Sequence, residues 1–248
     1  MKSKGITIME YGLQMYSVRD ITNDDLAGAL KKVAEIGYKY VEFAGFFGHP
    51  AEEVKAMLDE YGLIVSGTHS GLGDLDNDFA GTVKYHKAIG NKNYIIPGAP
   101  WDTKEGLDST IEKLNKYKPM LAAEGITLAY HNHDGEFRPN KDGQIAHEEM
   151  EKRSDINFEI DTYWAFVAGR DPVETITRLK DRVNVIHLKD GTKDKHGKAL
   201  GEGEAPVAAV RAKAIELGMR MVVESEGLQP TGIEEVTRCM NFLRSLEK

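Results

Sequence analysis

A repeating unit constrains this sequence more than any other feature. Short runs rich in β-branched and aromatic residues alternate with longer runs whose apolar residues recur every three or four positions, the period of a core-facing helix. The unit returns at intervals of roughly 30 residues, about the length of one strand–helix unit. Eight strands are predicted in this way, at residues 11–18, 40–44, 64–69, 94–97, 126–133, 156–163, 183–189 and 219–226.

Helical runs separate these strands, and their ends carry the expected signals. Residues 24–35, 104–123 and 207–217 are clear examples of such runs. Asp171 followed by Pro172 is typical of a helix start, where Asp accepts backbone N–H groups and Pro occupies the first turn. Five runs end on a glycine that leads into the next strand, as a left-handed C-cap does, at Gly37, Gly62, Gly90, Gly125 and Gly218.

Eight strand–helix pairs in succession predict an α/β fold, a single (β/α)8 TIM barrel that spans residues 1–248. The chain length of 248 residues fits, because one such barrel usually has about 250 residues. An open doubly wound sheet fits less well. It usually has fewer strands and often a glycine-rich phosphate loop, which none of the first strand–helix turns carries here.

Composition narrows the class of partner. The formal net charge is −8, and Lys and Arg are spread along the predicted helices, unlike the basic stripe of a nucleic-acid-binding surface. No run approaches the ~20 apolar residues of a membrane span. The lone Cys239 excludes an internal disulfide framework and favours a reducing compartment. We therefore expect a cytoplasmic protein that binds neither nucleic acid nor membrane and acts on a small molecule.

Polar residues that are unusual for buried strands gather at the predicted strand ends. In barrels of this kind the active site lies at the C-terminal ends of the strands. Five strands contribute side chains there. They are His69 from the third strand, His131 and His133 from the fifth, Glu159 and Asp161 from the sixth, His187 and Lys189 from the seventh, and Glu224 and Glu226 from the eighth.

Strand alternation aims these side chains at one volume. Ile186 and Leu188 are expected to face the helices, which requires His187 to face the barrel interior. By the same argument Val223 faces outward and Glu224 inward. Unpaired charges in that interior would be costly, and a divalent cation is the simplest group that neutralises them. Mixed nitrogen and oxygen ligands suit Mn²⁺, Zn²⁺, Co²⁺ or Fe²⁺ better than Ca²⁺.

Each of these residues also has a purely structural interpretation. A single histidine at a strand end is more often a hydrogen-bonded structural residue than a ligand. Asp161 could cap the loop that follows it, and Glu224 could pair with a nearby Lys or Arg. Their joint occurrence with His187 on consecutive strands favours the metal site.

At these positions the sequence resembles the sugar phosphate isomerase/epimerase family, the xylose isomerase-like barrels. The similarity covers essentially the whole chain. It includes the opening Gly-Leu-Gln-Met-Tyr-Ser at residues 12–17, the strand with Glu42, His-Leu-Lys-Asp at 187–190, and Glu224 within Val-Glu-Ser-Glu. Members hold one divalent metal with a Glu, an Asp, a His and a second Glu from strands five to eight. The resemblance implies that Asp161, His187 and Glu224 are metal ligands.

The fourth ligand departs from the family pattern. Where many relatives have Glu at the end of strand five, this chain has His131, which binds the same metals. We predict that His131 is the ligand and that Glu136 is a catalytic or substrate-binding group; the alternative is that Glu136 binds the metal. The Tyr-His-Asn-His-Asp sequence resembles the branch that contains inosose dehydratase-like and keto-sugar-processing members. The expected ion is Mn²⁺, with Zn²⁺, Co²⁺, Fe²⁺ or Mg²⁺ as alternatives.

The resemblance implies a metal-dependent isomerase or epimerase that removes a proton next to the carbonyl of a sugar or keto-sugar. The metal would bind the carbonyl and an adjacent hydroxyl oxygen and stabilise the enediolate. We expect catalytic roles for Glu136, Glu224 and Lys189, and substrate contacts from His69 and His133. Loss of a β-substituent instead would make the enzyme a lyase or dehydratase acting on an inosose or a 3-keto-glycoside.

Aromatic residues near the predicted mouth are candidates for a wall against the C–H face of a sugar. They are Trp101 and Trp164, with Phe46 and Phe47, although packing at the barrel rim is an equal alternative. The long loop at 191–205 is either a lid over the mouth or a solvated loop.

Two further classes of function share this barrel. An abasic-site endonuclease usually has more metal ligands and a cationic groove, which an acidic chain does not suggest. A non-catalytic polyol-binding protein would bind ligand without turnover. Barrels of this family are often dimers or tetramers, so a homo-oligomer is an open expectation.

Overall fold

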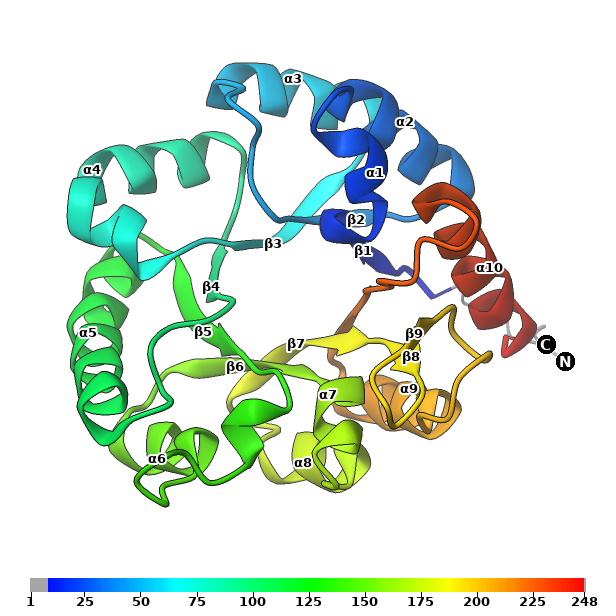
Figure 1. Ribbon diagram of the computed structural model, residues 1–248. Coiled ribbons are helices and arrows are strands. Elements are labelled where there is room, and N and C mark those ends of the chain that lie inside the picture. The colour runs from blue at the N-terminus through cyan, green and yellow to red at the C-terminus, as the bar shows by residue number, and fades with distance from the viewer. Residues whose placement is uncertain (1–8, 248) are drawn as a thin grey trace, which may run out of the picture.

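Eight parallel strands close into a barrel in a computed structural model that describes residues 9–247; residues 1–8 and 248 of the predicted domain lie outside the described part. The strand order around the barrel is β1-β10-β7-β6-β5-β4-β3-β2, and Figure 1 shows the helices arranged around it. The predicted (β/α)8 architecture is confirmed. The barrel strands are β1 (Gly12–Gln14), β2 (Tyr40–Phe43), β3 (Ile64–His69), β4 (Asn93–Ile96), β5 (Thr127–His131), β6 (Asn157–Asp161), β7 (Val183–Leu188) and β10 (Arg220–Val223).

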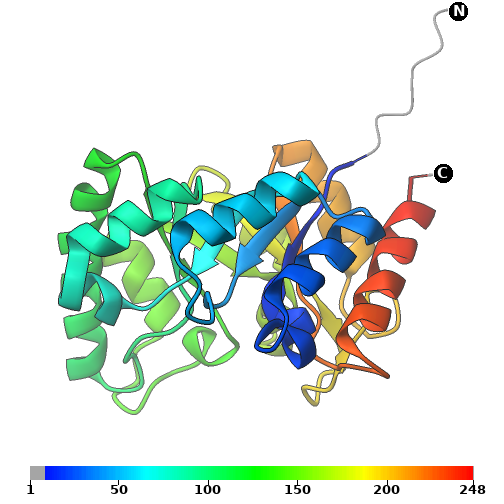
Figure 2. The ribbon, with the colours of Figure 1, turned by 90° about the horizontal axis from the view of Figure 1, so that it is seen from above.

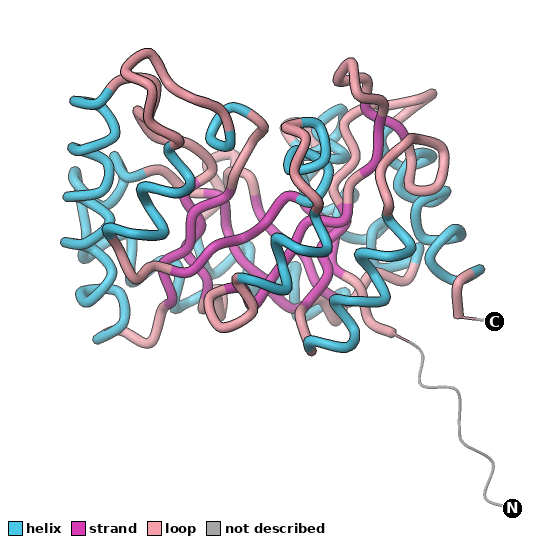
Figure 3. Tube along the Cα trace, turned by 90° about the horizontal axis from the view of Figure 1, so that it is seen from below, coloured by secondary structure: helices cyan, strands magenta, loops and turns pink. Residues whose placement is uncertain are grey.

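Helices form the outer layer, which Figure 3 shows as a jacket around the strands with long loops gathered at one end. Seen from above in Figure 2, the first and last parts of the described chain lie on the same side, and α10 packs against α2. None of the helices in this described part is long and apolar enough to cross a membrane. The α-helices are α1 (Arg19–Thr22), α2 (Leu26–Ile36), α3 (Ala51–Tyr61), α4 (Leu72–Ala88), α5 (Lys104–Ala123), α6 (Ala146–Arg153), α7 (Thr162–Val167), α8 (Pro172–Arg178), α9 (Val207–Leu217) and α10 (Gly232–Ser245), with 3-10 turns η1 (Met15–Val18) and η2 (Gly135–Phe137).

The helix ends follow the predicted signals. All five predicted C-cap glycines have positive φ, from 64° at Gly62 to 107° at Gly37. At Gly37 this conformation lets the chain turn from α2 toward β2 without the steric cost that a side chain would bring. The carboxylate of Asp171 accepts the backbone N–H groups of Val173 and Glu174 at the start of α8.

Several strands are shorter than predicted. The first strand stops at Gln14 rather than at residue 18, because the Gln14 side chain accepts the Tyr16 N–H and opens turn η1. The sixth stops at Asp161 rather than at residue 163, because Asp161 caps helix α7, which follows it directly. Side-chain hydrogen bonds at these strand ends therefore begin the next helical turn earlier than residue type alone predicts.

At the C-terminal ends of β7 and β10, the side chains that face the helices are apolar and those that face the barrel interior are polar, as predicted. Ile186, Leu188 and Val223 belong to the large apolar core that includes residues of the surrounding helices. Between them His187 is fully buried and contacts carboxylates from other strands. Outward-facing apolar residues therefore hold the helices, while polar side chains collect inside the barrel.

The loop after β7 is tied down along its length. It starts with a hairpin of β8 (Asp190–Gly191) and β9 (Gly197–Lys198), and the buried Asp190 carboxylate accepts three backbone N–H groups from later in the loop at 2.9–3.0 Å. Lys195 Nζ also lies 2.9 Å from Asp134 Oδ2 in the loop after β5, on the other side of β6. These contacts give the loop a defined conformation, and its role as a lid stays a prediction.

A buried polar cluster between β3 and α4 makes stability depend on pH. Burial lowers the pKa of His86 to about 4, and its Nδ1 lies 3.0 Å from Asn91 Nδ2 and 3.2 Å from Thr68 Oγ1. The unfolded chain, with a histidine pKa of about 6.5, takes up the proton first as the pH falls. The free energy of unfolding should therefore fall by about 3 kcal/mol from this residue between pH 6.5 and pH 4.

Urea unfolding of the wild type and of His86→Gln across that pH range measures this contribution. The carboxylates and the other histidines titrate equally in both proteins. The difference between the wild-type and variant slopes of unfolding free energy against pH therefore isolates His86. Equal slopes would contradict the assignment.

Candidate active site

The four predicted metal ligands lie together at the C-terminal ends of four neighbouring strands. His131 ends β5, Asp161 ends β6, His187 is the next-to-last residue of β7, and Glu224 follows β10 directly. One ligand atom from each lies within 4.8 Å of the others, and all four side chains are buried. The in-register pairing of Asp161 with His187 brings two of them side by side. The structure thus brings the predicted set into one volume.

Several atoms of this group have no hydrogen-bond partner. Both ring nitrogens of His131, Nδ1 of His187 and Oδ2 of Asp161 are buried and unpaired among the described residues. Each such buried polar group costs about 1–3 kcal/mol if nothing satisfies it. A cation among two imidazoles and two carboxylates would satisfy Oδ2 of Asp161, Nδ1 of His187 and one ring nitrogen of His131, and this donor set fits Mn²⁺, Zn²⁺, Co²⁺ or Fe²⁺.

Asp161 combines two roles that the sequence presented as alternatives. Its Oδ1 accepts the Trp164 N–H at 2.9 Å and caps α7, while Oδ2 points away without a partner. The helix cap therefore fixes the orientation of the free oxygen. Burial raises the pKa of Asp161 to about 7, with Glu224 adding to the effect and Lys189 opposing it.

Lys189 places a buried positive charge beside the cluster. Its Nζ lies 2.8 Å from Glu226 Oε2 and 3.0 Å from Glu224 Oε2, and 4.6 Å from the centre of the Trp164 ring. Burial alone would lower the pKa of Lys189, but the carboxylates of Glu224, Asp161 and Glu226 outweigh burial and raise it. The raised pKa keeps Lys189 positively charged beside Glu224 and Glu226.

A second set of charged residues, Glu42, His69 and Glu159, lies against the same histidine. The sequence analysis placed His69 and Glu159 at the strand ends but gave no role in the site to Glu159 or Glu42. His187 Nε2 lies 2.7 Å from Glu42 Oε1, and His69 Nε2 lies 2.8 Å from Glu159 Oε2. The alternation of inward- and outward-facing residues along each strand could have identified both glutamates. Glu159 shares a strand face with Asp161, and Glu42 stands between the buried apolar residues Val41 and Phe43. Burial and the neighbouring Glu42 raise the pKa of Glu159 to about 7.

A cavity of about 460 Å³ opens at this cluster. Predicted ligands and predicted substrate-binding histidines line it, together with Tyr16, which the sequence analysis quoted only within the opening motif. The lining combines histidine and carboxylate side chains with the small residues Ala44, Gly45 and Pro97. Its lining residues are Tyr16, Ala44, Gly45, His69, Pro97, His131, His133, Glu224 and Glu226.

Six residues predicted for the site do not line this cavity: Asp161, His187 and Lys189 are buried within the cluster, and Glu136, Trp101 and Trp164 have other surroundings. Glu136 lies in turn η2, and its carboxylate accepts the His133 N–H at 3.0 Å and the Tyr130 hydroxyl at 3.2 Å. Trp101 packs beside Gly135, where an added Cβ would lie 2.6 Å from its ring. The Trp164 ring lies over Lys189, and its centre is 6.0 Å from that of the His133 ring.

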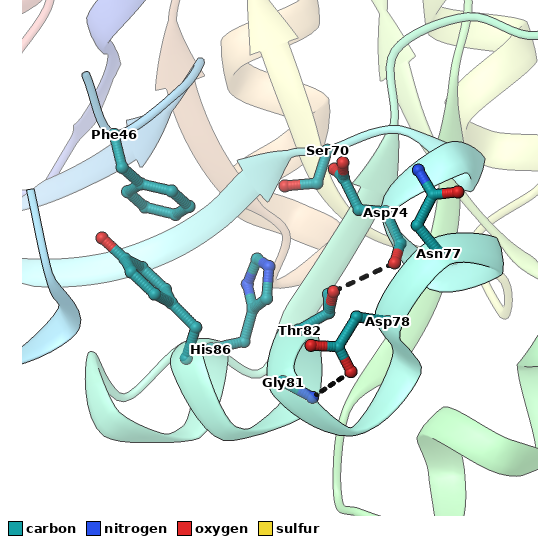
Figure 4. Close-up of a pocket in the computed structure, with 9 residues that line it drawn as sticks. Phe46, Ser70, Asp74, Asn77, Asp78, Gly81, Thr82 and His86 are labelled. Carbon is teal, nitrogen blue, oxygen red and sulfur yellow. Dashed lines mark hydrogen bonds between the residues drawn. The ribbon is translucent and has the colours of Figure 1, made fainter. Parts of the chain in front are cut away.

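A separate cavity of about 400 Å³ lies between the loop after β2 and helix α4 (Figure 4). Its polar groups serve the helix, because Asp78 Oδ1 accepts the Gly81 N–H at 2.9 Å and Thr82 donates to the Asp74 carbonyl oxygen at 3.2 Å. Phe46, expected on the aromatic wall, lies here. None of the predicted ligands or catalytic residues lines this cavity, so the chemistry concentrates at the barrel mouth.

The fold and the site together define the class of protein. A family model described as xylose isomerase-like TIM barrel matches residues 30–246. The chain therefore belongs to the xylose isomerase-like TIM barrel family, and the resemblance inferred from the sequence is confirmed.

Individual relatives are similar at moderate identity. Inosose dehydratases from Mesomycoplasma hyopneumoniae and Geobacillus kaustophilus are 29% and 24% identical, over 70% and 68% of this chain. The matches span about two thirds of those proteins, 68% and 66% of their length. A sugar phosphate isomerase/epimerase from Parabacteroides distasonis superposes with a TM-score of 0.83 at 26% identity, covering 96% of this chain and 99% of that one. All three are named as enzymes.

The raised pKa of Asp161 predicts the effect of one substitution on the metal-free protein. Because the folded-state pKa of about 7 exceeds the unfolded value, stability supplied by the protonated form is lost as the pH rises through 7. Asp161→Asn cannot ionise and keeps the oxygen that caps α7. In EDTA at pH 8 it should unfold about 5 °C above the wild type, with a smaller difference at pH 5.

Thermal unfolding with excess Mn²⁺ is the control, because an ion that binds only the wild type should reverse the order. A variant no more stable than the wild type in EDTA at pH 8 would contradict the account of this buried carboxylate.

Proposed function

We propose that this chain is a divalent-metal-dependent enzyme that moves a proton next to the carbonyl of a small keto-sugar or keto-polyol, as an isomerase or epimerase. One observation carries the proposal: unpaired ligand atoms of His131, Asp161 and His187 converge with Glu224 beside an open cavity. A divalent ion bound there supplies Lewis acidity, which polarises a carbonyl and acidifies the adjacent C–H.

The proton is removed by a carboxylate on the cavity wall. We assign this base to Glu226, because its side chain lines the cavity and is 30% exposed, while Lys189 holds its Oε2 at 2.8 Å. The sequence-based candidates for the base are Glu136 and Glu224. Glu224 is one of the proposed metal ligands, and Glu136 is the alternative base, whose two hydrogen bonds would have to open first. His69 and His133 line the cavity where they can hydrogen-bond substrate hydroxyls.

The charges around the cavity favour a neutral substrate. Among the described lining residues are two carboxylates, Glu224 and Glu226, and neither a Lys nor an Arg. Lys189 is buried and engaged by both carboxylates. A phosphate ester would face two like charges without a cationic partner, so we propose an unphosphorylated substrate.

A second candidate function is dehydration of a keto-polyol. The similarity to inosose dehydratases favours it. The first step is the same proton removal, and His69 on the cavity wall is placed to assist the departing β-hydroxyl. The two functions therefore share a first step and differ in the product.

Solvent exchange tests the shared step. Metal-loaded protein is incubated in D₂O with inososes, ketohexoses and 3-keto-glycosides, and NMR follows deuterium entering the carbon next to the carbonyl. Exchange should require the ion, and a phosphate ester of an active sugar should exchange more slowly. Glu226→Gln should lower the rate at least about 100-fold with the ion still bound, and Glu136→Gln should change it far less.

The product identifies the reaction class. Retention of all oxygens indicates isomerisation or epimerisation, and loss of water indicates dehydration. Absence of exchange with every substrate would contradict the proposal, and ligand binding without exchange would favour a polyol-binding protein. The reverse order of the two glutamate variants would transfer the role of base to Glu136.

A further inference from the structure

We infer that Glu42 is a positioning residue for the metal centre, because it fixes the proton of His187 on Nε2 and leaves Nδ1 as the ligand atom. Glu42 lies on β2, on the far side of the barrel interior from the ligand strands, and it was not among the residues predicted for the site. The inference rests on the proposed metal centre and deepens it.

His187 stands between two sets of carboxylates, one on each ring nitrogen. Its Nε2 lies 2.7 Å from Glu42 Oε1, a hydrogen-bond distance, and 3.3 Å from Glu159 Oε2. Its Nδ1 lies 3.3 Å from Glu224 Oε2 and 3.9 Å from Asp161 Oδ2 and makes no hydrogen bond. The ring therefore has one hydrogen-bonded nitrogen and one that faces the remaining ligands.

Glu42 is itself held in place. Gln14, its in-register partner on β1, donates from Nε2 to Glu42 Oε1 at 2.8 Å, and the Gln14 Oε1 accepts the Tyr16 N–H. On the other side of Glu42 is Gly67 of β3. A Cβ at this position would lie 3.0 Å from Glu42 Oε2, so the glycine provides the space that the carboxylate occupies. Glu42 is fully buried. A carboxylate with so little freedom can define the orientation of the imidazole it contacts.

The chemistry of imidazole connects this contact to metal binding. A neutral ring carries one N–H, and the hydrogen bond made by one nitrogen decides which nitrogen keeps a lone pair for a metal. Donation from Nε2 to Glu42 leaves the Nδ1 lone pair directed at Asp161 and Glu224. Partners of this kind typically contribute about 10- to 100-fold to metal affinity.

Glu42 is a better partner for this role than Glu159. Both contact the same nitrogen of His187, but the Glu159 distance is longer by 0.6 Å (3.3 against 2.7 Å). The preference reverses at His69 Nε2, which lies 2.8 Å from Glu159 Oε2 and 3.2 Å from Glu42 Oε1. The two glutamates thus form a matched pair, in which one substitution should affect the ion strongly and the other weakly.

The experiment measures ion affinity and the position of the proton. Zn²⁺ binding is measured by competition with a chelator for the wild type, Glu42→Gln and Glu159→Gln, with circular dichroism to verify folding. In ¹⁵N-histidine-labelled, Zn²⁺-loaded wild type, long-range ¹H–¹⁵N correlation identifies the protonated nitrogen of His187, assigned with His187→Asn. We expect about 10- to 100-fold weaker binding in Glu42→Gln, a smaller loss in Glu159→Gln, and the proton on Nε2.

Wild-type affinity in a folded Glu42→Gln, or a His187 proton on Nδ1, would overturn the inference alone and leave the metal centre standing. An ion bound through Nε2, in the second group formed by His69, His131, Glu159 and His187, would overturn it as well. Absence of any ion in the wild type would overturn both the inference and the proposed function. The NMR result on the wild type decides the matter even if the Glu42 variant does not fold.

Discussion

Closure of the barrel forces side chains from distant parts of the chain into one small interior, and the structure depends on how that interior accommodates charge. The strand pairing that closes the ring places His131, Asp161, His187 and Glu224 within ligand distance of one another. Apolar residues in their place would stabilise the fold better, since buried charges without partners carry a large desolvation cost. Retaining them in a buried layer is the pattern expected of a functional site, where stability is given up for chemistry.

The surroundings of this cluster supply the order that a metal site needs. Asp161 is oriented by the helix it caps, and Lys189 balances part of the negative charge through contacts with Glu224 and Glu226. Glu42 reaches His187 from across the barrel. The Asp190 carboxylate fixes the long loop beside the mouth through backbone N–H groups. Each contact restricts a side chain or loop before any substrate arrives, which is how a site acquires the geometry that catalysis requires.

The sequence predicts this architecture well wherever a regular period applies. The alternation of side chains along β7 and β10 correctly predicted that His187 and Glu224 face the barrel interior. The glycines that follow the helical runs correctly predicted where those helices end. Prediction fails where the regular strand or helix pattern ends. Glu136 lies in a 3-10 turn after β5, so the alternation along the strand does not predict which way its side chain points. The contact of Glu42 with His187 joins strands that are not neighbours, and it depends on strand stagger and barrel width, which no local pattern encodes.

The most direct test of the central claim is elemental analysis of the purified protein after loading with Mn²⁺ and removal of free metal. The wild type should retain about one divalent ion per chain, and Asp161→Asn and His187→Ala should lose it. His86→Gln, which alters a buried histidine away from the site, should retain the ion. A wild type without bound metal, or ligand variants that keep the ion as well as the wild type does, would contradict the account.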